Sequence, residues 1–284
     1  MFERLFSTVE RIFTKKVMFK YKLIIEYDGT GYRGWQAQQN AKSIQGTILQ
    51  VAVKALGPVS DFQGSGRTDA GVHALGQAAH LVTERPWEAK SLRERLNDAL
   101  PSNINVLSAE KVSPRFHARH HAVARSYVYV LSRSRTAFGK RFVWWVRDPL
   151  DPVAMEASLK LFKGFHDFAS FCDRRLEKGR STLVDLTEAE MRTAAGLVFF
   201  RFTGSHFLWK MVRRMVGVLV EAGRGTLKGE DIERFMTARS DEPANYTAPP
   251  SGLFLHQVLY EGETLKPFSP SSGFLFSSLP DVGS

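Results

Sequence analysis

The sequence predicts an α/β fold built from two similar halves, each with the element order β-α-β-β-α-β. Three observations support this prediction: runs that alternate apolar and polar residues, runs with apolar residues at helical spacing, and the recurrence of their order along the chain. Two such units could place their sheets side by side, with the helices on one face and a cleft on the other.

The first half begins with a strand from Phe19 to Tyr27, where apolar residues alternate with charged ones. Ser43 then precedes a run with apolar residues at helical spacing, which Gly57 and Pro58 end. The other elements predicted for this half are a strand at 59–63, a strand at 77–82, a helix at 91–100 and a strand at 104–107.

The second half repeats this order. Its predicted elements are a strand at 126–131, a helix at 152–163 with a proline in its first turn, strands at 183–191 and 196–202, a helix at 207–221, and a last strand at 253–260. The order alone therefore indicates an internal repeat.

These elements divide the chain into an N-terminal extension at 1–17, a first half at 18–113, a second half at 114–262 and a tail at 263–284. The extension has apolar residues at helical spacing, which would suit an amphipathic helix or a targeting peptide. Glu3 and Glu10 argue against a transit peptide, so we favour a simple extension ahead of Met18. The tail is rich in Ser, Pro and Gly, which predicts disorder.

Composition narrows the class of protein. Lys and Arg number 39 against 29 for Asp and Glu, a net charge of +10, which favours a polyanionic partner, most often nucleic acid. No run of 18 or more apolar residues predicts a membrane span. The single cysteine, Cys172, excludes a disulfide framework within the chain and argues against a cysteine-based zinc site. A reducing, intracellular compartment fits these features.

The stretch with the strongest chemical signal is GSGRTDAGVH at 64–73, a glycine-rich loop that carries Arg67 and Asp69. A nearby guanidinium favours the ionised form of a carboxylate, and an ionised carboxylate on a tight loop is a usable nucleophile. Two other interpretations exist. A dinucleotide fingerprint would need a glycine where Asp69 stands and a helix directly afterwards. A loop merely closed by an Arg–Asp pair would have no chemistry.

Read whole, GRTDAGVHA resembles the signature of the TruA family of tRNA pseudouridine synthases. Four further segments match the family in its own order: YDGTGYRGWQ at 27–36, FHAR with RSY at 116–127, FLWKMVRRMVG at 207–217, and APPSGL at 248–253. The resemblance implies the pseudouridine synthase fold, of class α/β (α+β). In this fold two α/β halves form a mixed, mainly antiparallel sheet with a central basic cleft.

The resemblance also implies a function. The family converts uridine to pseudouridine at positions 38, 39 and 40 in the anticodon stem-loop of tRNA, with an Asp nucleophile. The reaction involves no redox change and no bond to phosphate, so we expect no cofactor and no metal. We further expect a cytoplasmic enzyme without a membrane anchor, and a homodimer in which tRNA contacts both subunits.

Four residues align with reactive positions of the family. Asp69 is the expected nucleophile, with attack at ribose C1′ or at uracil C6 both left open. Arg213 is expected to orient and ionise Asp69, whereas Arg214 fits a solvated helix face better. Tyr127 could stack on the uracil, and its hydroxyl could hold the base or carry the C5 proton. Arg67 is expected to fill the space that a flipped base leaves.

The resemblance assigns further residues to substrate binding: Phe116, His117, Ala118, Arg119, His120 and Leu253. Leu253 is expected to pack beneath the site. The spacing of His117, His120 and His121 could suit a metal, but the interleaved arginines favour an RNA-facing segment. The stretch 173–181 contains four basic residues and matches the family only loosely; we interpret it as a basic loop that faces RNA.

Two competing classes remain. A non-catalytic RNA-binding protein on the same scaffold would suit the basic charge and the 12% aromatic content, yet it would not need Asp69. A nucleotide- or NAD-dependent enzyme would need the missing third glycine. The synthase is therefore the favoured interpretation.

Overall fold

The computed structural model describes residues 17–173, 175 and 181–267. Within these residues, ten strands form one sheet with the order β4-β1-β3-β10-β5-β9-β8-β7, while β2 pairs with β3 and β6 pairs with β5. The strands are β1 (Phe19–Tyr27), β2 (Val59–Gly64), β3 (His73–Thr83), β4 (Ile104–Lys111), β5 (Ala122–Ser132), β6 (Trp144–Trp145), β7 (Gly164–Asp167), β8 (Leu183–Ala194), β9 (Leu197–Gly204) and β10 (Leu253–Tyr260).

The two halves join where β3 meets β10. This pairing is parallel and aligns Phe254 with His73 and Leu255 with Ala74. β5 and β6 are also parallel, and the other strand pairs are antiparallel. The predicted fold class, a mixed and mainly antiparallel sheet made by two similar halves, is confirmed.

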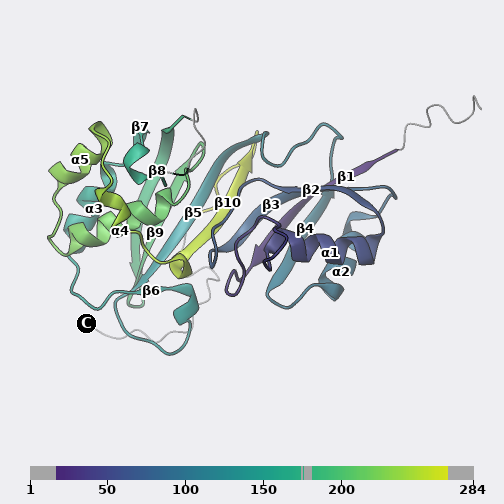
Figure 1. Ribbon diagram of the computed structural model, residues 1–284, viewed down its shortest axis with the longest axis horizontal. Coiled ribbons are helices and arrows are strands. Elements are labelled where there is room, and N and C mark those ends of the chain that lie inside the picture. The colour runs from purple at the N-terminus through teal and green to yellow at the C-terminus, as the bar shows by residue number, and fades with distance from the viewer. Residues whose placement is uncertain (1–16, 174, 176–180, 268–284) are drawn as a thin grey trace, which may run out of the picture.

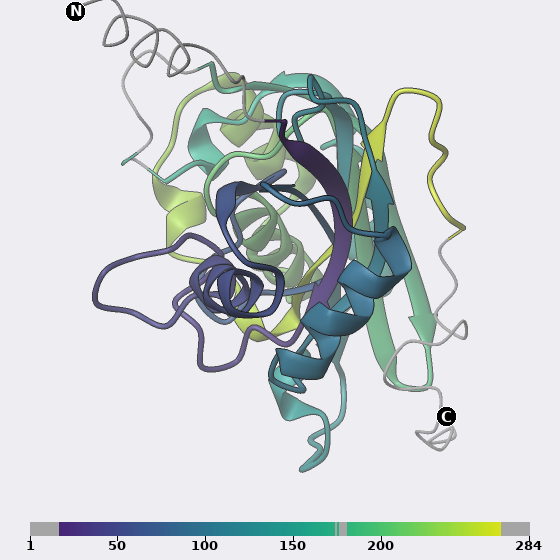
Figure 2. The same cartoon turned by 90° about the vertical axis from the view of Figure 1, so that its right-hand side faces the viewer.

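Five α-helices cover the sheet: α1 (Ile44–Leu56), α2 (Ala89–Ala99), α3 (Pro152–Lys160), α4 (Met211–Gly223) and α5 (Gly229–Thr237) among the described residues. Figure 1 shows α1 and α2 at one end of the sheet and α3, α4 and α5 at the other. In Figure 2 the first pair lies toward the viewer, with the helices of the second half behind it. No helix in the described ranges is long and apolar enough to cross a bilayer.

Local sequence explains where several helices begin and end. The Ser43 hydroxyl caps α1 by accepting from the backbone N–H of Gly46, and Gly57 ends the helix with a φ of 87°. Glu88 caps α2 through the N–H of Ser91. Asp151 caps α3, and Pro152 occupies its first turn.

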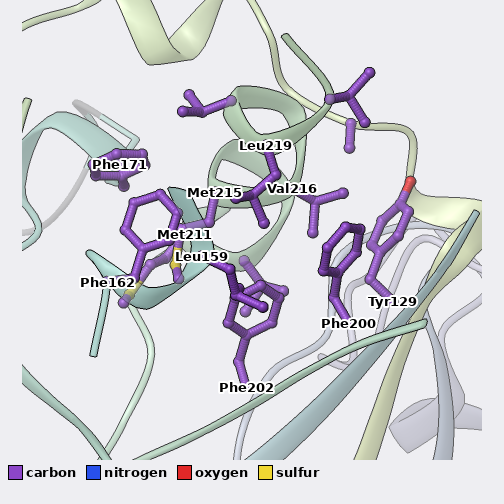
Figure 3. Packing of buried hydrophobic residues seen from close by; sticks show 14 of the residues in the cluster. Tyr129, Leu159, Phe162, Phe171, Phe200, Phe202, Met211, Met215, Val216 and Leu219 are labelled. Atoms are coloured by element: carbon purple, nitrogen blue, oxygen red, sulfur yellow. The ribbon is translucent and has the colours of Figure 1, made fainter. Parts of the chain in front are cut away.

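Each helical group packs on its own hydrophobic core. The buried cluster around Tyr21, Leu23 and Ile25 of β1 is called the N-terminal core; it also contains residues of α1, α2 and β3. The C-terminal core surrounds α4 and contains buried aromatic and aliphatic side chains. Those labelled in Figure 3 are Tyr129, Leu159, Phe162, Phe171, Phe200, Phe202, Met211, Met215, Val216 and Leu219.

Tyr127 contacts both cores from β5, so both helical groups lie on the face of the sheet that Tyr127 occupies. The expectation that the helices lie on one face of the sheet is therefore met, but the site does not lie on the opposite face. The site described below lies on the helical face, between the two groups, because its arginine projects from α4.

The predicted elements are present, with shifted ends. The helix expected at 207–221 begins only at Met211, because Lys210 adopts a left-handed conformation with a φ of 65°. β6, β7 and α5 were not predicted. Two of them are very short strands, and α5 depends on one amphipathic face whose buried residues are Ile232 and Phe235.

The ends of the chain test the division only in part. Residues 1–16 and 268–284, most of the extension and of the expected disordered tail, lie outside the described residues. The first part of the tail is held against the sheet. Glu263 forms a 2.6 Å ion pair with Lys22, and the Lys266 carbonyl accepts from Arg201 at 3.1 Å. The domain boundaries stay a prediction.

At Gly217 of α4, we expect substitution by alanine to lower the stability of the protein, the opposite of its usual effect in a helix. A Cβ at this position would lie 1.5 Å from the carbonyl oxygen of Tyr246, whereas alanine usually strengthens a helix interior. We expect Gly217→Ala to destabilise the protein by about 3 kcal/mol, measured by urea unfolding. Gly229→Ala is the control, since its Cβ would meet only ordinary contact at 3.7 Å from Leu161. Equal stability of the two variants would contradict this packing.

His256 of β10 predicts a pH effect on stability. Burial, with Arg201 and Lys266 nearby, lowers the pKa of His256 from 6.5 to about 4. The unfolded chain thus takes up a proton near pH 6.5, but the folded chain does so only near pH 4. The free energy of unfolding therefore decreases as the pH is lowered from 6.5 to 4. As the pH is lowered from 7 to 4, the free energy of unfolding of His256→Asn should rise by about 3 kcal/mol relative to that of wild type, as measured by chemical unfolding at each pH. A His256→Asn variant with the wild-type pH dependence of stability would contradict this assignment.

Candidate active site

The loop between β2 and β3 is held by close contacts of its backbone with the segment after β1. The N–H of Trp35 donates to the Thr68 carbonyl at 3.1 Å. At Gly34, with a φ of 90°, an added Cβ would lie only 2.5 Å from the same carbonyl oxygen. Gly29 approaches the Val72 carbonyl even more closely, with 2.0 Å for an added Cβ. These glycines are required because no side chain fits between the two segments.

The loop is also tied down from the sheet beneath it. The Tyr27 hydroxyl and the Thr68 hydroxyl are 2.8 Å apart, and burial raises the pKa of Tyr27 well above its usual value. The Ser65 hydroxyl donates to the Gln77 side chain at 2.9 Å, and Gln77 donates to the Gly66 carbonyl at 3.0 Å. Sequence reasoning missed these supports. The loop backbone around Asp69 is therefore fixed before any substrate arrives.

The Asp69 carboxylate is held by two donors from the other half of the chain. Arg213 Nη1 donates to Oδ2 at 3.0 Å, and Trp209 Nε1 donates to Oδ1 at 2.9 Å. The side chain of Asp69 is 23% exposed and that of Arg213 is 14% exposed, so the pair is partly withdrawn from water. A carboxylate that is partly withdrawn from water is stabilised by such donors.

Arg213 is itself held in place. Its Nε donates to the Ala248 carbonyl at 2.7 Å, and the N–H of Ala248 donates back to the Arg213 carbonyl at 3.0 Å. The guanidinium thus donates to the backbone through Nε and to the Asp69 carboxylate through Nη1. Arg213, the partner expected for Asp69, forms the ion pair, whereas Arg67 in the same loop as Asp69 is exposed.

The neighbouring Arg214 corrects one expectation. It was assigned to a solvated helix face, but it is buried and donates to the carbonyls of Ser170 and Cys172. These bonds fasten the segment before residue 173 to α4. The helix lies deep in the C-terminal core, so neither arginine points into solvent. Arg214 binds the backbone at Ser170 and Cys172, and Arg213 binds Asp69.

Two tyrosines of β5 share one face of the sheet and have different surroundings. Tyr129 is fully buried, and its hydroxyl donates to the Pro249 carbonyl at 2.8 Å, so it is a packed residue. Tyr127 is half-buried and packs edge to face against Phe207, with 4.9 Å between the two ring centroids. Burial raises the pKa of Tyr127 to about 12; Arg125 opposes this rise and the charge of Asp69 adds to it. Tyr127 is therefore neutral at physiological pH.

Arg125 holds the chain around Tyr127 in place. It donates to the carbonyls of Ser205, Ala122 and Arg119 at 3.0, 3.1 and 2.9 Å. Burial lowers the pKa of this guanidinium. Because its donors are used by backbone carbonyls, Arg125 fastens the segment 119–125 to the backbone at Ser205, beside the site.

Comparison with known proteins identifies the family. A family profile described as tRNA pseudouridine synthase matches residues 23–121 and 159–261. The chain belongs to the tRNA pseudouridine synthase family. It is 41% identical over 245 residues to tRNA pseudouridine synthase A of Syntrophotalea carbinolica, covering 84% of this chain and 95% of the relative. Identity to the protein of the same name from Sinorhizobium fredii is 36% over 248 residues, covering 86% and 100%.

A third relative, tRNA pseudouridine synthase A 1 of Protochlamydia amoebophila, is 38% identical over 253 residues, covering 87% of this chain and 98% of its own length. The resemblance drawn from the motifs is therefore confirmed, and the family is one of isomerases. The dinucleotide interpretation is wrong for a structural reason as well. The glycine-rich loop leads into strand β3, whereas a phosphate-binding loop of that kind leads into a helix.

The segment matched to RNA contact in this family has both anchored and exposed residues. Ala118 is buried, its N–H donates to His80 at 3.1 Å, and its carbonyl accepts from Tyr260 at 2.8 Å. Arg119 and His120 are exposed, while Phe116 and His117 are half-buried. Ala118 thus anchors the segment, and RNA contact by its neighbours stays a prediction. Among the described residues, no group of three or more acidic, His or Cys side chains could hold a metal.

The remaining predicted residues occupy different surroundings. Leu253 is 6% exposed, opens β10 and pairs with Tyr129, as a packing residue beneath the site would. Arg174 and 176–180, the greater part of the expected basic loop, lie outside the described residues. Within that loop, Asp173 binds Arg175 at 3.0 Å and Lys210 at 2.9 Å, so one acidic side chain offsets part of its basic charge.

Gly34 provides a test of how firmly this loop must be placed. A methyl group there would press on the Thr68 carbonyl and shift Asp69, and a displacement of about 1 Å can lower a rate about 100-fold. We expect Gly34→Ala to lower pseudouridine formation on tRNA by about that factor. Gly31→Ala is a matched control, because Gly31 also has a positive φ, of 80°, but open space around it. Equal activity of the two variants would contradict the role of this contact.

Proposed function

We propose that this protein isomerises uridine to pseudouridine at positions 38, 39 and 40 in the anticodon stem-loop of tRNA, with Asp69 as the nucleophile and without a cofactor. The observation that carries the proposal is the Asp69 carboxylate on a rigid loop, held by Arg213 at 3.0 Å in a family of tRNA pseudouridine synthases. The positions within tRNA rest on the motif resemblance.

The geometry supports nucleophilic attack in two ways. An ionised carboxylate has about four lone-pair sites, and the two observed hydrogen bonds leave others for a reacting carbon. The loop contacts also fix the carboxylate in advance, so that little conformational freedom is lost in the reaction. Asp69 remains partly exposed, as a residue that meets a substrate must be.

The chemistry balances without an electron carrier. The N1–C1′ glycosidic bond breaks, a C5–C1′ bond forms, C5 loses a proton and N1 gains one. Attack of Asp69 at C1′ displaces the uracil, whereas attack at C6 gives an adduct in which the base is held while it turns. Either route ends with the carboxylate released unchanged.

Tyr127 is proposed to hold the uracil. Its hydroxyl is neutral, because its pKa is about 12, so it is a better hydrogen-bond donor than a proton acceptor at physiological pH. Its ring is kept upright by the edge-to-face contact with Phe207 and can offer one face to a base. Leu253 would pack beneath this base.

Arg67 and the segment 116–120 are proposed to contact the RNA around the site. A uridine in a stem must leave its stack before Asp69 can reach it, at a cost of about a few kcal/mol. Arg67 is exposed and only two residues from Asp69, so it can enter the space left by the base. Arg119 and His120 are exposed and can meet phosphates. Cytoplasmic location and a homodimer that shares one tRNA complete the proposal.

A non-catalytic RNA-binding role is the alternative. A binding protein would gain nothing from a partly withdrawn carboxylate, which repels phosphate and requires Arg213 to stabilise it. The ion pair, the braced loop and the neutral tyrosine are together more consistent with catalysis. Binding of tRNA without product would favour the alternative.

The decisive test combines product mapping with one substitution. Purified protein is incubated, without added cofactor or metal, with an unmodified tRNA transcript, and pseudouridine is mapped by carbodiimide-blocked primer extension. We expect product at positions 38 to 40 with wild type and a loss of at least about 10⁴-fold with Asp69→Asn, which keeps shape but not nucleophilicity. Exposed Asp98→Asn should retain full activity.

Each outcome has a clear meaning. Product elsewhere in tRNA would keep the reaction and remove the anticodon assignment. Product from Asp69→Asn at the wild-type rate would remove Asp69 as the nucleophile. No product from wild type, together with retained tRNA binding, would sink the catalytic proposal. Replacing each of the three uridines by cytidine, one at a time, separates the three positions.

A further inference from the structure

The second donor to Asp69 is an indole, that of Trp209. Its Nε1 donates to Oδ1 at 2.9 Å, while Arg213 donates to Oδ2 at 3.0 Å. The two donors thus bind different oxygens of one carboxylate.

The position of Trp209 follows from the start of α4. The helix begins at Met211, and Lys210 before it adopts a left-handed conformation with a φ of 65°. This turn takes Trp209 out of the helix and lets its side chain reach across to the loop of the first half, 140 residues away in the sequence. A helix that began at Phe207 would place residue 209 differently relative to Arg213.

The indole is fixed by its own surroundings. The Asp173 N–H donates to the Trp209 carbonyl at 3.0 Å, and the Asp173 carboxylate binds Lys210 at 2.9 Å. The Arg175 guanidinium lies 4.2 Å from the centre of the indole ring, a cation–π contact, and is itself held by Asp173 at 3.0 Å. The basic residues Arg175 and Lys210 hold the pKa of Asp173 well below its usual range, so the cluster keeps its charges.

A second donor changes what the carboxylate can do. With Arg213 alone, the carboxylate could rotate about its Cβ–Cγ bond, a torsion with broad, weak preferences. A donor on each oxygen fixes both the plane of the group and its direction. Trp209 can only donate and carries no charge, so it fixes the plane without adding a further cation beside Arg213.

We propose that Trp209 is a positioning residue for Asp69: its N–H sets the plane of the carboxylate for attack on the substrate. This inference rests on the proposed function of Asp69. It assigns Trp209 an effect on the chemical step through Asp69, and it assigns the ring of Trp209 no contact with tRNA.

The test separates the N–H from the ring. Trp209→Phe keeps an aromatic ring for Arg175 to cover but removes the donor. Trp145→Phe is the matched control, since Trp145 is exposed to a similar degree, 40% against 38%, and is likewise covered by an arginine, Arg135 at 5.8 Å. Single-turnover pseudouridine formation, the Kd for tRNA and the urea midpoint are measured for wild type and both variants.

We expect Trp209→Phe to lower the single-turnover rate about tenfold while the Kd and the urea midpoint stay at the wild-type values. Trp145→Phe should match wild type in all three measurements. The separation of rate from affinity is the readout that a merely structural role would not give, because loss of packing would lower stability and binding as well.

Three results would overturn the inference. An unchanged rate in Trp209→Phe would show that the N–H is not needed. A weaker Kd with an unchanged rate would make Trp209 an RNA-contacting residue instead. A lower urea midpoint that accounts for the lost activity would make it structural. A wild-type protein that forms no pseudouridine would instead contradict the proposed function, so the two failures are distinguishable.

Discussion

The ion pair between Asp69 and Arg213 is the interaction on which the site depends, and it joins the two halves of the chain. Each partner alone would be a poorly solvated charge, with side-chain exposures of 23% and 14%. Removing either would leave the other unpaired, and such a change is far more costly than losing a surface salt bridge. The sheet brings Asp69 and Arg213 close to each other, because the parallel pairing of β3 with β10 joins the two halves. The site exists only when both halves are folded and joined.

Rigid backbone supplies the second constraint. The loop of Asp69 packs so closely against 29–35 that Gly29 and Gly34 have no room for a Cβ. Hydroxyl contacts such as Tyr27 with Thr68 hold the loop from the sheet side. A loop of this kind keeps its carboxylate in place without help from the substrate. In the proposed reaction, binding energy from distant parts of the RNA would then be free to drive the base out of its stack.

The sequence predicts the elements well where periodicity is strong and local. β1 and β10 were predicted with their observed ends, and the Ser43 cap and Gly57 locate α1. Asp69, Arg213 and Tyr127 were proposed as a group, and the structure brings the first two into contact. The start of α4 could not be predicted, because the left-handed turn at Lys210 depends on tertiary contacts. For the same reason Trp209 and buried Arg214 were missed: no local pattern shows that a residue beside a helix start reaches another segment.

The neutral state of Tyr127 bears on the order of events at the site. A phenol that stays protonated at physiological pH can donate a hydrogen bond to a uracil oxygen, but it is poorly matched to remove the C5 proton. Asp69 is negatively charged at the start and contributes to the raised pKa of Tyr127. Once Asp69 is bonded to the substrate, its negative charge passes to the uracil, which is an N1 anion after attack at C1′ or an enolate after attack at C6. The charge therefore stays beside Tyr127 and continues to favour the neutral phenol. Within the proposed mechanism, Tyr127 would stabilise this anionic base by donating a hydrogen bond to it.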